Sequence, residues 1–212
     1  MKKQITTLLI TVICALPIYG FTVSTTNLVD TSSDGALPVV DTSDTQITHL
    51  GGVLATGYFA TVADGDLATT EFSSLLADFD QLGGSLAFDN SFNIDALFDV
   101  SLGDAIGAGS DFIGKSVYIV MGNGSSLATS SELAVFKDSS LTFDEDTNSP
   151  GGSVVITPGD LPSGLLVGSI GGPETVSGTT FDNSIILAQN IPEPSVTILG
   201  LLGMLGLLRR RR

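Results

Sequence analysis

Apolar residues in this chain fall mostly in short runs separated by glycine, serine, asparagine and aspartate. Residues 53–62 are dense in β-branched and aromatic side chains and lie between Gly51-Gly52 and an Asp-Gly-Asp turn, which is typical of a β-strand. Residues 117–121 and 132–137 are apolar at successive positions, which predicts central strands covered on both faces. Further strands are predicted at residues 85–88, 96–100, 140–143, 153–157, 165–170 and 181–188.

The spacing of apolar residues becomes helical between residues 67 and 82. Five large apolar residues recur there three or four positions apart: Phe72, Leu75, Leu76, Phe79 and Leu82. Gly83-Gly84 follows as a stop signal, so we predict one amphipathic helix at 67–82 whose apolar stripe faces the core. Many short strands with a single helix predict a mainly β fold, an antiparallel β-sandwich or roll.

The N-terminus has the layout of a secretory signal peptide. Lys2 and Lys3 give a positive start, residues 5–16 are apolar, and residues 18–20 offer a cleavage site. We predict that residues 1–20 direct export through the Sec translocon and are removed. The only cysteine, Cys14, leaves with them, so the exported chain has no disulfide and no thiolate chemistry. Residues 21–52 are predicted to form a loose Asp/Ser/Thr-rich approach to a β-rich extracellular domain at 53–190.

The C-terminus combines two prolines, an uncharged apolar stretch and a basic end. Residues 196–208 span about 20 Å as a helix, short of the roughly 30 Å hydrocarbon core, so a short C-terminal hydrophobic helix is predicted. By the positive-inside rule the basic end stays in the cytoplasm and the preceding domain lies outside. Pro192 and Pro194 disfavour extension of the helix upstream. The basic end consists of Arg209, Arg210, Arg211 and Arg212.

In this order and at this position, Pro192, Glu193 and Pro194, the apolar stretch and the arginines resemble the PEP-CTERM sorting signal of Gram-negative bacteria. The resemblance covers residues 191–212. It implies that an exosortase-type membrane protease recognises Pro192, Glu193 and Pro194 and cuts near them. It further implies a transient inner-membrane anchor, delivery to the cell surface or extracellular matrix, and exopolysaccharide as a partner. The alternative is a plain C-terminal anchor with an incidental proline pair.

The charge of the predicted exported part is strongly one-sided. Residues 21–190 contain 22 of the 23 acidic residues and only two basic ones, Lys115 and Lys137, which gives a formal net charge of −20. Such a charge repels nucleic acids and anionic lipid surfaces. Nucleic acids are therefore excluded as partners, whereas cations and neutral polymers remain.

Residues 109–116 satisfy the G-x-x-x-x-G-K-[ST] pattern of a phosphate-binding loop. In that loop a helix follows the lysine, whereas here a strand is predicted from residue 117, and Asp111 would bring a negative charge to the phosphates. We therefore predict no nucleotide site. His49 is the only histidine and no G-x-S-x-G pentad occurs, which argues against a serine triad and a multi-histidine metal centre.

Acidic motifs raise the question of calcium, which prefers oxygen ligands. Residues 144–148 begin like an EF-hand loop, but Ser149 replaces the required glycine and Val155 the required glutamate. Asp64-Gly65-Asp66 and Asp78-Phe79-Asp80 are shorter acidic pairs, more typical of turns or solvated faces. We predict no resident cofactor and leave open one weak Ca²⁺ site among these motifs.

The leading hypothesis is a non-catalytic exported protein whose β-rich domain has a structural or adhesive role. One alternative is an acid-pair hydrolase of matrix polysaccharide, because many carboxylates are present. Residues 21–190 lack tryptophan and arginine, which usually line sugar subsites, and this disfavours the hydrolase. A Ca²⁺-dependent binding module is the other alternative.

Overall fold

The computed structural model describes residues 21–28, 35–104, 106, 109–144 and 151–190, which form a mainly β fold with several antiparallel sheets. The predicted fold class is confirmed at this level. The largest sheet has seven strands, all in antiparallel pairs: β10, β8, β7, β3 and β4 in that order, with β15 beside β8 and β5 beside β3. Its strands are β3 (Val53–Phe59), β4 (Phe79–Gln81), β5 (Leu86–Ala87), β7 (Ser116–Gly122), β8 (Glu132–Thr142), β10 (Leu165–Val167) and β15 (Ala188–Gln189).

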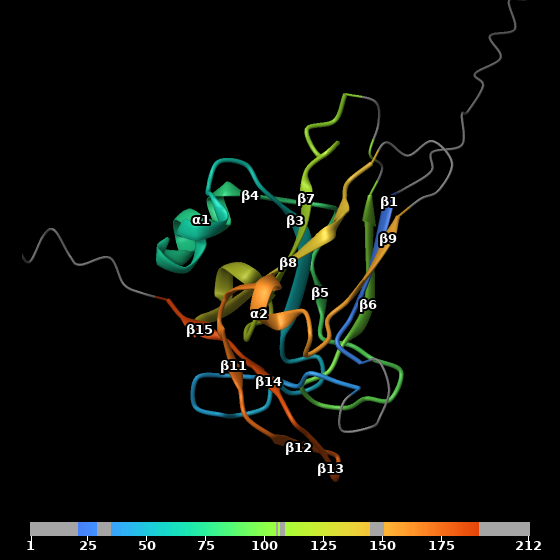
Figure 1. The fold of residues 1–212 in the computed structure, drawn as a ribbon, viewed down its shortest axis with the longest axis vertical. Coiled ribbons are helices and arrows are strands. Elements are labelled where there is room, and N and C mark those ends of the chain that lie inside the picture. The colour runs from blue at the N-terminus through green and yellow to red at the C-terminus, as the bar shows by residue number, and fades with distance from the viewer. Residues whose placement is uncertain (1–20, 29–34, 105, 107–108, 145–150, 191–212) are drawn as a thin grey trace, which may run out of the picture.

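Three smaller sheets complete the described strands. They are formed by β6 (Asp99–Asp104), β1 (Phe21–Thr26) and β9 (Gly152–Val155); by β11 (Ser169–Gly171), β14 (Ser184–Ile186) and β2 (Val39–Val40); and by β12 (Glu174–Val176) with β13 (Thr179–Phe181). The pairs β1–β9 and β2–β14 are parallel, a departure from the antiparallel prediction. In Figure 1 the β6-β1-β9 sheet lies on one side of the large sheet and α1 (Phe72–Asp78) on the other.

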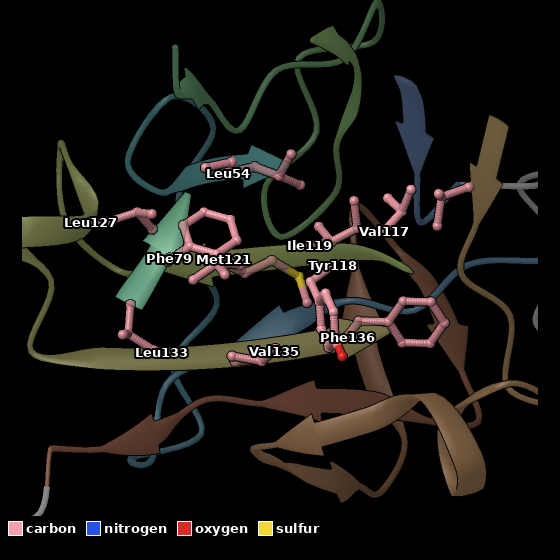
Figure 2. Close-up of a cluster of buried hydrophobic side chains, with 14 of the residues drawn as sticks. Leu54, Phe79, Val117, Tyr118, Ile119, Met121, Leu127, Leu133, Val135 and Phe136 are labelled. Carbon is pink, nitrogen blue, oxygen red and sulfur yellow. The ribbon is translucent and has the colours of Figure 1, made fainter. Parts of the chain in front are cut away.

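Strand β7 lies at the centre of the large sheet, between β3 and β8. Its residues from Val117 to Met121 are all buried, and so are the first five residues of β8. Figure 2 shows side chains from β3, β4, β7, β8 and the 3₁₀ helix η2 (Leu127–Thr129) gathered around it. The prediction that 117–121 and 132–137 are central strands is confirmed. Since a fully buried apolar side chain contributes about 1.5–3 kcal/mol, this ladder contributes strongly to stability.

The predicted helix at 67–82 is wrong in extent. A 3₁₀ helix, η1, occupies Asp64–Thr69, α1 covers only seven residues, and β4 follows at once. Thr70 and Glu71 are extended, and the Glu71 carboxylate caps α1 by accepting the Ser74 N–H at 3.3 Å. Phe79–Gln81 pairs with β3 and so cannot remain helical. The apolar stripe is core, as predicted, with Phe72, Leu75, Phe79 and Leu82 all buried.

The prediction of a loose approach at residues 21–52 is not met in the described part of that segment. Strand β1 alternates buried Phe21, Val23 and Thr25 with more exposed neighbours, and it pairs with β6 and β9. Strand β2 is fully buried against β14. Serine and threonine fit a strand in which buried and exposed residues alternate. The polar composition of this segment therefore did not reveal the strands.

The other predicted strands are found with shifted limits. The segment 96–100 is replaced by β6, the segment 165–170 is divided between β10 and β11, and the segment 181–188 is divided among β13, β14 and β15. None of the helices in the described residues has the length and apolar character needed to cross a bilayer. The predicted signal peptide at 1–20 and the predicted C-terminal hydrophobic helix lie outside the described residues.

Leu54 and Leu86 provide a matched test of the core because they are opposite one another in β3 and β5, 0% and 40% exposed respectively. Leu54→Ala should lower the free energy of unfolding by about 2–5 kcal/mol, since it leaves a cavity. Leu86→Ala should cost less than about 1 kcal/mol. Urea unfolding followed by circular dichroism measures both, and equal losses would contradict the assigned core.

Candidate functional site

The residues predicted as the sorting signal lie outside the described residues: Pro192, Glu193, Pro194, Arg209, Arg210, Arg211 and Arg212. The structure does show how the chain is held immediately before them. β15 pairs with the start of β8, with Ala188 opposite Leu133 and Gln189 opposite Glu132. The last described residue, Asn190, follows this pair.

Asn190 ties the end of the domain to two other elements. Its backbone N–H donates to the Ser131 carbonyl at 3.2 Å. Its side-chain Oδ1 accepts the Phe72 N–H at 3.3 Å, and this N–H lies in the first turn of α1, where no helical partner exists. The chain is therefore held to the fold up to the residue that precedes the predicted sorting signal.

A buried carboxylate supports the same corner. Glu132 accepts the Thr42 N–H at 2.9 Å and the Thr42 hydroxyl at 2.6 Å. The Gln189 side chain in turn donates to the Thr42 hydroxyl oxygen at 3.1 Å. Because buried carboxylates are costly without such partners, this network joins β8, β15 and the segment after β2.

A groove of about 300 Å³ lies between β8, β9 and α2 (Leu161–Gly164). Its β8 wall is a bulge: Asp138 is opposite Val117 in β7, but the next paired residue of β8 is Thr142, opposite Ser116. The Asp138 Oδ1 atom holds the bulge by accepting the Ser140 N–H and hydroxyl, each at 2.7 Å. The sequence Asp-Ser-Ser thus interrupts the ladder through its own side-chain hydrogen bonds.

The opposite wall of the groove comes from the turn into α2. Asp160 Oδ2 accepts the Thr157 N–H at 3.1 Å and its hydroxyl at 2.6 Å. Pro162 stands in the first turn of α2, where its missing N–H costs nothing. Gly164 faces Phe136 so closely that an added Cβ would lie 2.4 Å from the ring, which makes glycine necessary for this contact.

Beside the groove, Lys137 forms an ionic cluster with a 3₁₀ helix. The Lys137 Nζ atom donates to Asp64 Oδ2 at 2.6 Å, and the Tyr118 hydroxyl donates to Asp64 Oδ1 at 2.6 Å. Nζ also lies 5.3 Å from the centre of the Tyr118 ring. The second lysine, Lys115, is placed similarly, 5.5 Å from the centre of the Tyr58 ring. Both lysines of residues 21–190 therefore form cation–π contacts.

Protonation in this cluster follows from burial and hydrogen bonds. Burial opposes ionisation of Asp64, but the Lys137 and Tyr118 hydrogen bonds outweigh it and hold its pKa below the usual 3.8. The bond to Asp64 raises the pKa of Lys137, and burial together with Asp64 raises that of Tyr118. Burial and a hydrogen bond with Asp80 raise the pKa of Tyr58 to about 12. Neither tyrosine nor Lys137 is thereby activated as a base near neutral pH.

The P-loop-like motif at 109–116 leads into a strand rather than a helix, as predicted. Gly114 adopts a positive φ of 76° and its N–H donates to the Phe143 carbonyl at 2.8 Å, after which β7 begins at Ser116.

His49 ties two loops: its Nε2 lies 3.0 Å from Asp89 Oδ1, and its backbone N–H donates to Asp95 at 2.6 Å.

Where the structure describes the candidate calcium motifs, the carboxylates of Asp64 and Asp78 accept hydrogen bonds from other parts of the fold. Asp64 belongs to the lysine cluster, and Asp78, the last residue of α1, accepts the N–H groups of Thr61 and Val62. Part of the EF-hand-like motif, residues 145–148, lies outside the described residues. Among the residues that the structure describes, no three His, Cys, Asp or Glu side chains are grouped to hold a metal.

Asp44 and Glu174 form an interacting pair of acidic side chains. Burial raises the pKa of Glu174, and a hydrogen bond with Asp44 raises it further. Gln46 bridges the same two segments, because its side chain donates to Glu174 at 3.4 Å and to the Thr175 carbonyl at 2.8 Å. The pair therefore belongs to the contact between the segment after β2 and strand β12.

No protein-family model, curated protein or solved structure matches this chain.

The groove was not predicted from the sequence, because its walls come from three segments that only the fold brings together. The local signals were the polar turn residues 138–140 and 157–160, and these predict turns without indicating that they face one another.

Asp64→Asn tests the ionic cluster. Because the folded pKa of Asp64 is depressed, its ionised form stabilises the protein above about pH 4, and this contribution is lost as the pH falls through the folded pKa. We expect a loss of about 0.5–1 kcal/mol at pH 7, small because solvent screens the partly exposed pair, and a smaller loss at pH 2.5. Urea unfolding at both pH values measures it. Asp66→Asn, in the same 3₁₀ helix, should be neutral at both; an equal Asp64→Asn loss at both would contradict the ionic explanation.

Proposed function

We propose that this chain is an exported protein, processed at a PEP-CTERM-type signal by an exosortase-type membrane protease and delivered to the cell surface or extracellular matrix. The observation that carries the proposal is the C-terminal order of Pro192-Glu193-Pro194, the apolar stretch 196–208 and four arginines. The Sec-type leader at 1–20 accounts for export, and the C-terminal helix for a transient inner-membrane anchor.

The end of the described domain is consistent with cleavage near the Pro-Glu-Pro motif. Strand β15 and the hydrogen bonds of Asn190 involve only residues before 191. A cut at or beyond residue 191 removes no strand and no core residue of the described domain. The folded part would thus keep its stability after release from the membrane.

For the domain we propose a β-sandwich or roll with a non-catalytic structural or adhesive role. The β6-β1-β9 sheet and the large sheet share one hydrophobic cluster, which includes Val23, Leu102, Ile119 and Phe136. The pKa values of Lys137 and Tyr118 are raised, so the ionic cluster contains no activated base. A net charge of −20 suits a soluble extracellular protein that does not bind polyanions.

The experiment that tests the proposal is the intact mass of the protein in cytoplasm, membranes, surface wash and medium of its native cells. We expect the surface or medium form to lack about the first 20 residues and the tail beyond the Pro-Glu-Pro region. Glu193→Gln and Pro192→Ala/Pro194→Ala should leave the full tail attached and the protein in the membrane fraction.

The chain offers a matched control, because Pro173-Glu174 repeats part of the motif at the start of the β12–β13 hairpin. Glu174→Gln should be processed like the parent protein. A released form that retains Arg212, or a membrane-bound form with the tail intact as the sole product, would refute the sorting proposal.

A further inference from the structure

We propose that the groove between β8, β9 and α2 binds a neutral polyhydroxylated chain, that is, a segment of uncharged glycan. The groove gathers polar atoms that the fold leaves unused. The hydroxyls of Ser139 and Ser153 make no hydrogen bond within the described residues, and neither does Asp138 Oδ2 or Asp160 Oδ1. Such a set of donors and acceptors is complementary to sugar hydroxyls, which both donate and accept.

The two carboxylates are held in place before any ligand arrives. The other oxygen of Asp138 is fixed by Ser140 and Leu141, and that of Asp160 by Thr157. A ligand therefore has to immobilise little of the protein, which favours binding. Hydrogen bonds from hydroxyl donors to ionised carboxylates are about twice as strong as bonds between neutral groups.

The groove also has an apolar part that suits the C–H face of a sugar ring. Val155 is 40% exposed and lies beside Ser153 on β9. Phe136 and Gly164 line the groove as well, but Phe136 is only 3% exposed, so Val155 supplies the accessible apolar surface. Burial of this apolar surface would add to the polar contacts.

Charge selects a neutral ligand. The only basic residue of the groove, Lys137, has its ammonium group paired with Asp64, so the groove offers carboxylates without a free cation. Phosphate- or uronate-bearing chains would be repelled by these groups and by the net charge of −20. Calcium takes six to eight oxygen ligands, whereas the groove supplies two carboxylates, which favours a hydroxyl ligand over a metal.

Affinity electrophoresis of the purified full-length chain in non-ionic detergent tests the inference. The probes are dextran, galactomannan and the neutral polysaccharide isolated from the medium of the native cells, with alginate as the anionic counterpart. We expect at least one neutral polymer to slow migration and alginate to have no effect. Ser139→Ala/Ser153→Ala should weaken retardation about tenfold, since two hydrogen bonds are lost, and Ser153→Tyr should abolish it by filling the groove.

Ser125→Ala is the matched control, because Ser125 is an exposed serine outside the groove that makes no hydrogen bond in the described structure. It should migrate like the parent chain, and circular dichroism checks that every variant is folded. Equal retardation of the double variant and the parent, or no retardation by any neutral polymer, would overturn the inference. Retardation lost in EDTA and restored by Ca²⁺ would also overturn it in favour of a metal-dependent site. An adhesive role for glycan binding rests on the proposed function. The assay itself needs neither export nor processing, so the glycan proposal and the sorting proposal can fail independently.

Discussion

The constraint on which the structure depends is that the central sheet must be covered on both faces. Tyr58 and Phe59 of β3 point to opposite faces of the large sheet, and each makes contacts with other aromatic rings. Phe59 packs on Phe79 and Tyr118, with ring centroids 5.1 Å apart in both pairs. On the other face, Tyr58 lies 4.9 Å from Phe112, which begins a chain of rings that continues to β1. A strand apolar on both faces requires a layer on each side, and α1 and the three-stranded sheet supply them.

The β6-β1-β9 sheet explains why the polar residues of β1 form part of the folded domain. Phe112 contacts Phe143, and Phe143 contacts Phe21 of β1, at 5.1 and 5.5 Å between ring centres. β1 then brings β6 and β9 into the same sheet although they come from distant parts of the chain. The parallel β1–β9 pair and the bulge of β8 place Ser153 beside the Asp138 turn, so the groove is a by-product of how the small sheet covers the large one.

Scarcity of positive charge shapes the polar chemistry of the domain. With only Lys115 and Lys137 against 22 acids, self-repulsion opposes compaction, and each lysine lies over a tyrosine at the surface of the large sheet. Many carboxylates instead accept backbone N–H groups and hydroxyls in turns, as Asp78, Asp138 and Asp160 do. Hydrogen bonds within the fold therefore stabilise their charge locally.

The sequence by itself determined the mainly β class, the central position of 117–121 and 132–137, and the burial of the apolar stripe around α1, because local hydrophobic pattern reports burial directly. The leader and the Pro-Glu-Pro tail are also features of sequence alone, and they stay predictions. Only the tertiary structure decided that the helix ends at Asp78, since residues 79–81 pair with β3 and cannot also be helical. It also decided that β1 joins the core and that β8, β9 and α2 meet in one groove. Strand pairing joins residues far apart in the chain, and no local pattern specifies the partner.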